Sequence, residues 1–221
     1  MNQRLLVIAM MLAACGLVIS FEVKVQAAAN GNLLAYPGFE EIANGAPAGW
    51  GRYAPVGSPK GLQVSTEART GKYAALIDVA ASLADSDVKA ARVAWYHQRI
   101  PGDADGQAER GAQYRFSAYY RTEGNLKGTL AVERRTLAGK LDNAYLDLSP
   151  TKEWRQATLV FTWPEAGDYG VHVGLYAWLA TEGKIWFDDV ELVKLDRDSV
   201  PDSIARSGGS STGFRSKQGH L

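Results

Sequence analysis

Several stretches of this chain alternate apolar and polar residues with a period of two, which is the pattern of a β-strand that buries one face. In residues 112–123 the apolar face would carry Tyr114 and Phe116, and charged or polar side chains would occupy the other face. The same period recurs in 154–163 and 170–179. Because no window has a sustained helical period, about nine to eleven turn-punctuated strands predict an all-β, two-sheet antiparallel β-sandwich.

Two adjacent carboxylates, Asp188 and Asp189, interrupt a strand-like run near the end of the folded part. In a regular strand Asp188 would share a face with Val190 and Leu192, and Asp189 would point to the opposite side. A carboxylate beside an apolar core needs a cation, an arginine or several N–H donors. The pattern therefore predicts that Asp188 meets a metal ion or a partner such as Arg69.

The N-terminal residues 1–29 have the features of a secretory signal peptide. Arg4 supplies a basic start, residues 5–21 are almost continuously apolar, and small residues ending at Ala29 offer a cleavage site. A retained membrane anchor is one alternative, and lipidation at Cys15, whose preceding residues resemble a bacterial lipobox, is another. All three interpretations predict an extracytoplasmic protein, secreted, periplasmic or at the cell surface.

The rest of the chain divides into one domain, residues 30–196, and a tail, residues 197–221, whose Ser- and Gly-rich composition predicts disorder. The 24 basic and 24 acidic residues balance, and no basic stripe argues for a nucleic-acid partner. Cys15 is the only cysteine, so the mature domain has neither a disulfide framework nor a thiolate metal site.

Residues able to carry catalysis are not arranged for it in the sequence. His97, His172 and His220 lack metal-ligand spacing and are more simply interpreted as surface polar residues. Asp188 and Asp189 are neighbours in a strand, so their side chains diverge and cannot flank one glycosidic bond. We therefore predict a non-catalytic protein.

Aromatic residues on polar strand faces are the best candidates for a binding function. Tyr119, Tyr176 and Trp178 occur with Arg121 on such faces, and this mixture of flat rings and polar groups suits sugar rings. Trp95 is a weaker candidate of the same kind. The alternative is that these aromatic side chains pack at the edges of the sandwich.

Five segments together carry a resemblance to the carbohydrate-binding modules appended to xylanases and glucanases. They occur in the same order and comprise Asn32-Leu33-Leu34 with Gly38-Phe39-Glu40, Pro47-Ala48-Gly49-Trp50, Thr70-Gly71-Lys72-Tyr73, the run from Tyr114 to Arg121, and the run from Ile185 to Leu192. The resemblance implies a calcium-containing jelly roll of the galactose-binding-like kind, with ligands bound on a concave sheet face.

The resemblance also implies a structural calcium ion. Its ligands would be the side chains of Glu40 and Asp188 and the carbonyl of Lys72, with Glu67 as a fourth. Oxygen ligands of this kind suit a hard cation such as Ca²⁺. The ion would tie the first strand to the last.

These features support a secreted, non-catalytic polysaccharide-binding module that stacks aromatic rings on a β-glucan-like or xylan-like chain. One alternative is a structural or adhesive envelope protein that uses the sandwich to dock another protein. A further alternative is an accessory part of a glycoside-hydrolase system.

Overall fold

The computed structural model describes residues 31–84, 87–97, 100, 108–135, 141–164 and 170–196. The predicted signal peptide with Cys15, the predicted tail and His220 lie outside these residues. Within the described part, the structure contains no helix with the length and apolar character needed to cross a membrane.

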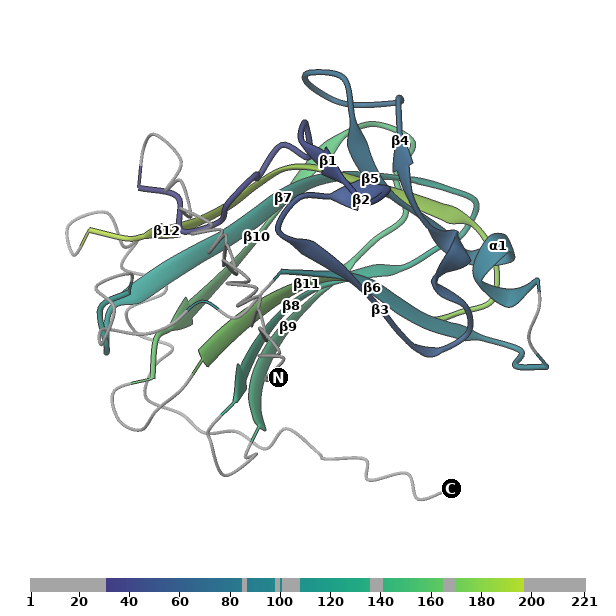
Figure 1. Cartoon of the computed structure of the whole chain (residues 1–221). Coiled ribbons are helices and arrows are strands. Elements are labelled where there is room, and N and C mark those ends of the chain that lie inside the picture. Colours follow the sequence, from purple (N-terminus) through teal and green to yellow (C-terminus); the bar gives the residue numbers. More distant parts are fainter. Residues whose placement is uncertain are drawn as a thin grey trace, which may run out of the picture.

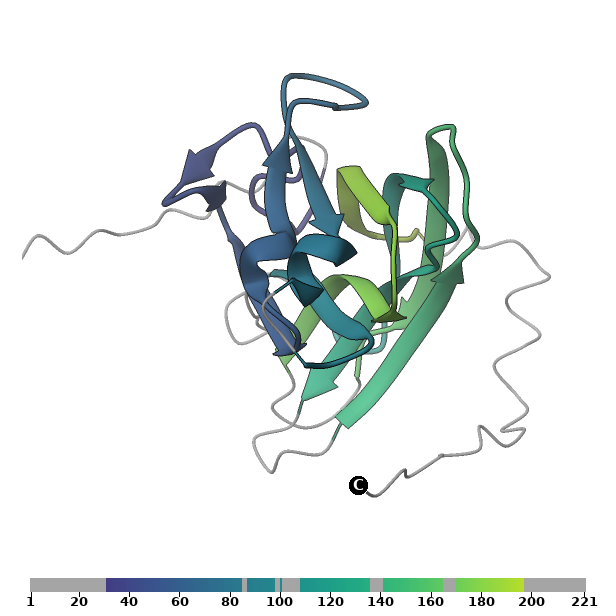
Figure 2. The ribbon, with the colours of Figure 1, turned by 90° about the vertical axis from the view of Figure 1, so that its right-hand side faces the viewer.

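Two antiparallel sheets of five strands each stack face to face (Figures 1 and 2), which confirms the predicted two-sheet sandwich. The first, the β7 sheet, has the order β10 (Arg155–Thr162), β7 (Gln113–Glu123), β12 (Lys184–Lys194), β5 (Ala74–Asp78) and β4 (Leu62–Ser65). The second, the β11 sheet, has the order β3 (Trp50–Val56), β6 (Ala91–His97), β11 (Gly170–Ala180), β8 (Gly128–Arg135) and β9 (Leu141–Leu148). The small hairpin of β1 (Ile42–Ala43) and β2 (Ala46–Pro47), the 3₁₀ helix η1 (Pro59–Gly61) and α1 (Val79–Leu83) complete the described elements.

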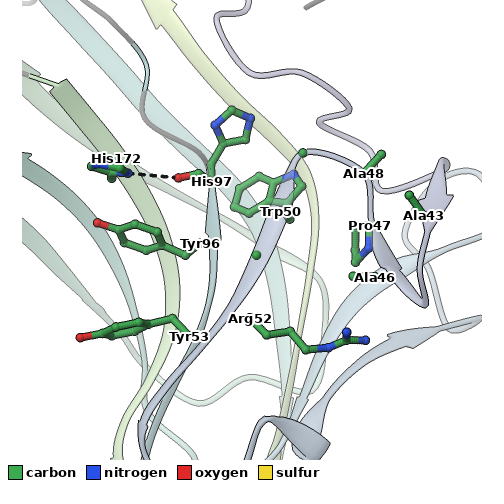
Figure 3. Close-up of a pocket in the computed structure, with 12 residues that line it drawn as sticks. Ala43, Ala46, Pro47, Ala48, Trp50, Arg52, Tyr53, Tyr96, His97 and His172 are labelled. Atoms are coloured by element: carbon green, nitrogen blue, oxygen red, sulfur yellow. Dashed lines mark hydrogen bonds between the residues drawn. The ribbon is translucent and has the colours of Figure 1, made fainter. Parts of the chain in front are cut away.

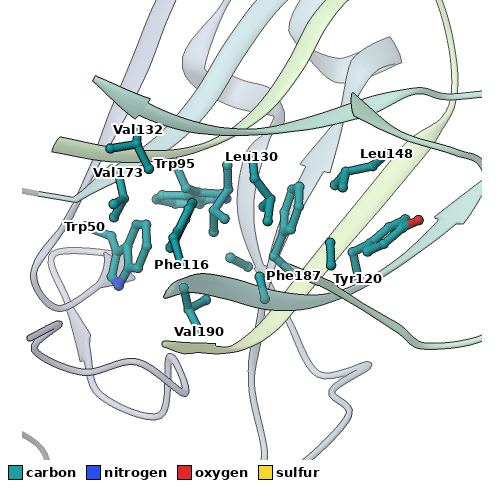
Figure 4. Close-up of a cluster of buried hydrophobic side chains, with 14 of the residues drawn as sticks. Trp50, Trp95, Phe116, Tyr120, Leu130, Val132, Leu148, Val173, Phe187 and Val190 are labelled. Carbon is teal, nitrogen blue, oxygen red and sulfur yellow. The ribbon is translucent and has the colours of Figure 1, made fainter. Parts of the chain in front are cut away.

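The hydrophobic core lies between the two sheets (Figure 4). Phe116 and Phe187 of the β7 sheet and Val173 of the β11 sheet are all fully buried in it. Trp95 is also fully buried there, and its indole Nε1 donates a hydrogen bond to the carbonyl of Leu76 at 3.0 Å. This bond links a strand of one sheet to a strand of the other.

The predicted alternation in residues 112–123 is confirmed. Tyr114, Phe116 and Tyr120 are buried in the core, whereas Arg115 and Tyr119 on the other face are only half-buried. The period of two therefore identified the core face of β7 correctly.

The prediction that Asp188 shares a face with Val190 and Leu192 is wrong, although Val190 and Leu192 do lie in the core. Asp188 pairs with Tyr119, but Glu191 pairs with Ser117, so two residues of β12 oppose a single residue of β7. This is a β-bulge, and Asp189 adopts a left-handed φ of 46° within it. Because the bulge reverses the alternation, Val190 returns to the core while Asp188 faces away from it.

A second bulge corrects the prediction for residues 170–179. Trp178 pairs with Arg92 and Ala180 pairs with Ala91, so Leu179 is an extra residue on β11. Its φ is 50°, and the side chain that the alternation assigns to the core is 63% exposed. The bulge expels Leu179 and keeps Ala180 buried.

Three further differences concern local elements. The apolar run of residues 73–79 predicts a strand and residues 81–87 a polar connection, but residues 79–83 form α1, with the Asp78 side chain accepting a hydrogen bond from the Ala81 N–H as an N-cap. The apolar run of residues 88–100 predicts a strand, and β6 begins three residues later than this run, at Ala91, and spans Ala91–His97. Strand β3 was not predicted, because Gly51 and Pro55 weaken its pattern.

Candidate functional site

The outer surface of the β11 sheet collects aromatic rings from four of its five strands. Strand pairing sets Tyr96 of β6 opposite Gly174 of β11, and sets Ala131 of β8 opposite Gly174 on the other side. Small residues therefore lie in the middle of this surface, and rings flank them. We call this surface the aromatic face, and its rings are Tyr53, Tyr96, Tyr145, His172, Tyr176 and Trp178.

Tyr176 occupies the centre of the aromatic face and is only 1% exposed. Its ring lies over Gly174, where there is no side chain to obstruct it. The Tyr176 hydroxyl donates a hydrogen bond to Glu133 Oε1 at 2.7 Å, and the Tyr96 hydroxyl donates one to Glu133 Oε2 at 2.9 Å. The centre is thus closed and well packed, and open space lies on either side of it.

One open hollow, which we call the Trp178 hollow, lies toward β9 and has a volume of about 590 Å³. Trp178 and Tyr145 are 40% and 44% exposed, and their ring centroids are 6.4 Å apart with planes inclined at 56°. Polar groups stand beside the rings, because Lys127, Thr129 and Asp147 also line the hollow. The hollow therefore combines two exposed aromatic rings with one positively charged, one negatively charged and one hydroxyl side chain.

A second hollow, which we call the Trp50 hollow, lies at edge strand β3 and has a volume of about 510 Å³. In Figure 3 the side chains of Tyr53, Tyr96 and His172 stand on one side of it, and Pro47 and its neighbours in the β1–β2 hairpin stand on the other. The rings of Tyr96 and His172 stack at 5.0 Å with planes inclined at 21°. This hollow therefore borders the other end of the aromatic face.

Neighbouring groups contact the rings of the aromatic face and raise the pKa of two of its phenols. The Arg92 guanidinium lies 5.0 Å from the centroid of the Trp178 ring, a cation–π contact. Burial, followed by the hydrogen bond and charge of Glu133, raises the pKa of Tyr176 far above its ordinary value. Burial also raises the pKa of Tyr145, against the opposing effect of its hydrogen bond with Asn143. Both phenols therefore stay protonated near neutral pH.

The structure separates the five predicted ligand residues. Trp178 is exposed in a hollow, and Tyr176 is the buried centre of the same face. The prediction for Trp95 is corrected, because its side chain is fully buried between the sheets and has no surface to offer a ligand. Its outward-facing neighbour in the strand, Tyr96, contributes to the aromatic face instead.

Tyr119 and Arg121 lie on the outer surface of the opposite sheet, away from Trp178. The Arg69 guanidinium covers the Tyr119 ring at 3.5 Å. Arg121 lies 4.3 Å from the centroid of Trp186 and forms an ion pair with Glu67. Because β7 and β11 belong to different sheets, Tyr119 and Arg121 do not share a face with Tyr176 and Trp178, and a ligand role for Tyr119 and Arg121 stays a prediction.

Sequence reasoning missed several residues that line the hollows. The alternation of Asn143, Tyr145 and Asp147 along β9 was a usable signal, since it puts an aromatic ring between polar residues on one face. Tyr53 was missed together with strand β3. Glu133 gave no local signal, because only strand pairing brings it to the two phenols.

The three acidic residues predicted as calcium ligands, Glu40, Glu67 and Asp188, do not gather into one cluster. Both oxygens of Glu40 accept hydrogen bonds from backbone N–H groups, those of Lys72 and Tyr73. Glu67 pairs with Arg121. Across the described ranges, no group of three or more His, Cys, Asp or Glu side chains is placed to hold a metal ion.

Asp188 is fully buried and is surrounded by N–H donors. Its Oδ2 accepts from the N–H groups of Arg69 at 2.8 Å and Thr70 at 3.1 Å, and its Oδ1 accepts from the N–H of Asp189 at 2.8 Å. The side chain of Arg69 pairs with the neighbouring Asp189 at 2.6 Å. Both acids therefore fasten the loop between β4 and β5 to the bulge in β12.

The first segment is tied to the last strand by an asparagine. The Asn32 side chain donates to the carbonyl of Val190 at 3.0 Å and accepts from the N–H of Leu192 at 2.9 Å. The N–H of Leu33 also donates to the carbonyl of Leu192 at 2.8 Å. Hydrogen bonds thus make the connection that the resemblance assigns to calcium, and calcium binding stays a prediction.

No protein-family model matches the chain, and no curated protein matches its sequence. Solved structures do share its fold. They include the enzymatically active domain of tailspike protein 4 from bacteriophage CBA120, at 12% identity and a TM-score of 0.53, over 77% of this chain and 22% of that one. The CBM22-1 xylan-binding domain of Paenibacillus barcinonensis Xyn10C has 14% identity and a TM-score of 0.51, over 72% of this chain and 92% of that one.

A family 4 carbohydrate-binding module has 18% identity and a TM-score of 0.50, over 73% of this chain and 99% of that one. At these identities the likeness concerns the fold. The chain therefore has the jelly-roll β-sandwich fold found in carbohydrate-binding modules.

Proposed function

We propose that this chain is a non-catalytic polysaccharide-binding module whose ligand lies on the aromatic face of the β11 sheet. The observation that carries the proposal is the Trp178 hollow, in which two exposed rings, Trp178 and Tyr145, stand beside Lys127, Thr129 and Asp147. Aromatic rings pack against the C–H faces of sugars, while charged and hydroxyl groups bond their hydroxyls.

The fold supports the proposal as an analogy. Two of the structures that share it are carbohydrate-binding modules, and one of these is described as xylan-binding. Fold alone does not determine function, so the proposal depends mainly on the side chains that line the Trp178 hollow. We expect a β-linked glucan or xylan chain as the ligand class.

Affinity gel electrophoresis of the domain tests the proposal. We expect retardation in gels containing at least one of xylan, barley β-glucan, galactan and hydroxyethylcellulose. Trp178→Ala and Tyr145→Ala should each weaken binding about tenfold or more, because exposed central aromatic residues carry a large share of binding energy. The matched control is Trp154→Ala, which removes a half-buried indole that packs beside Trp186 in the β7 sheet, on the opposite side of the sandwich.

Two outcomes would contradict this proposal. One is free migration in every polysaccharide gel, and the other is retardation that Trp178→Ala leaves unchanged. Retention of an envelope protein by the wild type but not by Trp178→Ala, with no polysaccharide binding, would favour the alternative of a protein-docking scaffold. Release of reducing ends from a bound polysaccharide would contradict the non-catalytic part.

Export and association with other proteins belong to the same proposal. We propose that residues 1–29 direct secretion, with cleavage after Ala29, and that lipidation at Cys15 is the competing route. Mass spectrometry of the mature N-terminus distinguishes an Asn30 start from a lipidated Cys15. A glycoside hydrolase acting on the bound polysaccharide would be a natural partner.

A further inference from the structure

We propose that Glu133 is a positioning residue whose carboxylate holds Tyr96 and Tyr176 together and thereby fixes the rings at both hollows. The proposal deepens the proposed function, on which its binding arm rests. Glu133 is buried and does not line the Trp178 hollow, so its role would be to hold residues that do contact the rings of the hollow.

The carboxylate of Glu133 joins three strands. Glu133 belongs to β8, Tyr176 to the neighbouring strand β11, and Tyr96 to β6 beyond it. Each carboxylate oxygen accepts one phenol, at 2.7 Å from Tyr176 and 2.9 Å from Tyr96. Glu133 is only 7% exposed, and burial of an acidic group is costly unless hydrogen bonds offset the lost water.

The two phenols anchored by Glu133 touch the rings at the rims of the hollows. The Tyr176 ring lies 5.6 Å from that of Trp178 and 6.3 Å from that of Tyr53. The Tyr96 ring lies 5.8 Å from Tyr53 and stacks on His172 at 5.0 Å. A ring contact therefore connects each anchored phenol to at least one hollow.

The position of the Tyr176 ring depends on its hydrogen bond to Glu133, because only small residues lie beneath the ring. Gly174 supplies no side chain, and Ala94 and Ala131 supply only methyl groups around the ring. Small neighbours interlock little with the ring, whereas a hydrogen bond to a fixed carboxylate defines one orientation. Preorganised rings lose less conformational freedom when a ligand binds, so the anchor should raise affinity.

Glutamine at position 133 separates this role from simple volume filling. Glu133→Gln keeps the shape, but its amide nitrogen is a donor and cannot accept a phenol O–H. One of the two phenols thus loses its acceptor. Glu182→Gln, at an exposed position between β11 and β12, removes the same charge from a surface side chain and serves as the control.

The experiment combines near-UV circular dichroism with binding to xylan and barley β-glucan. We expect Glu133→Gln to change the aromatic bands at a temperature where the protein is folded, and to weaken polysaccharide binding about tenfold. Glu182→Gln should match the wild type in both. In a Tyr96→Phe/Tyr176→Phe background, Glu133→Gln should add little further change to the aromatic bands, because the hydrogen bonds from the two phenols are already gone.

Wild-type aromatic bands together with wild-type affinity in Glu133→Gln would overturn the proposal. A lower unfolding temperature alone would not rescue it, because loss of stability without a change in the rings indicates a purely structural role. If Glu133→Gln does not fold, Tyr176→Phe and Tyr96→Phe each remove one hydrogen bond while keeping the ring. Unchanged spectra and affinity in both would equally contradict it. If the wild type binds no polysaccharide, the proposed function fails, and the spectra still decide whether Glu133 positions the rings.

Discussion

The ring of Tyr176 lies so close to Gly174 that a Cβ atom on residue 174 would stand 2.4 Å from Cε2 of the ring. Real Cβ atoms do not come this near to another heavy atom, so the ring and a side chain at position 174 exclude each other. A glycine in the middle of a strand is usually a weakness, since it has no side chain to pack. Here it makes room for the centre of the aromatic face.

Gly174→Ala should therefore displace the Tyr176 ring, lower the free energy of unfolding by about 1–3 kcal/mol and weaken polysaccharide binding. Chemical denaturation, near-UV circular dichroism and affinity electrophoresis measure the three effects. Gly51→Ala is the matched control, because a Cβ there would make an ordinary 3.6 Å contact with the carbonyl of Tyr96. Equal behaviour of the two variants would contradict the prediction.

Leu179 combines a left-handed backbone with an exposed apolar side chain. Its φ of 50° is unfavourable for leucine, and 63% exposure leaves little burial to offset the strain. Asparagine tolerates this conformation better, so Leu179→Asn should stabilise the protein by roughly 0.5–1 kcal/mol. Thermal and urea denaturation measure the change.

The control for Leu179 is Ile42→Asn, at an exposed apolar position in β1 without a left-handed backbone. It should not stabilise the protein. Destabilisation by Leu179→Asn would show that contacts of the leucine side chain outweigh the backbone strain.

The buried Asp188 should make stability depend on pH. Burial raises its pKa from 3.8 to about 6, with the charge of Asp189 adding to the rise and the N–H groups of Thr70, Asp189 and Arg69 opposing it. The folded state then binds more protons than the unfolded state between about pH 4 and pH 6, so stability falls as pH rises through this window. The free energy of unfolding should fall by about 3 kcal/mol across it, because each tenfold change in proton concentration contributes about 1.4 kcal/mol.

Urea denaturation between pH 4 and pH 7, in the presence of a chelator, tests this dependence. Asp188→Asn should flatten the profile in that window, because the titrating group is gone. Asp147→Asn, which alters an exposed carboxylate on β9, should retain the wild-type slope. A wild-type profile that rises over the same window would refute the assignment to Asp188.

Calcium binding by Glu40, Glu67, Lys72 and Asp188 is testable by chelation. If the ion binds, calcium at about 100 times its Kd should stabilise the fold by about 2.7 kcal/mol and raise the unfolding temperature by roughly 5–10 °C relative to chelator. Asp188→Asn should abolish the difference, and Glu182→Gln should preserve it. An unfolding temperature that chelator and calcium leave unmoved would mean that the N–H donors around Asp188 and Glu40 suffice without a metal.

The sequence by itself determined the sandwich and much of its core. Alternation is a local property, because successive side chains of a strand point to opposite faces, and in β7 it assigned Tyr114, Phe116 and Tyr120 to the core correctly. Alternation does not say which of the two sheets a strand joins. The sequence therefore could not tell that Tyr119 and Trp178 lie on opposite outer surfaces.

Tertiary structure decided the faces wherever a bulge intervened, and it decided the site. An extra residue in β12 puts Asp188 and Val190 on opposite faces, and an extra residue in β11 brings Leu179 to the solvent. Trp95 faces the core and Tyr96 faces outward because neighbouring residues of a strand point to opposite faces, and only the place of β6 in the sandwich decides which face is buried. Glu133 meets its two phenols only through strand pairing between segments far apart in sequence, and a contact of that kind leaves no local pattern in the chain.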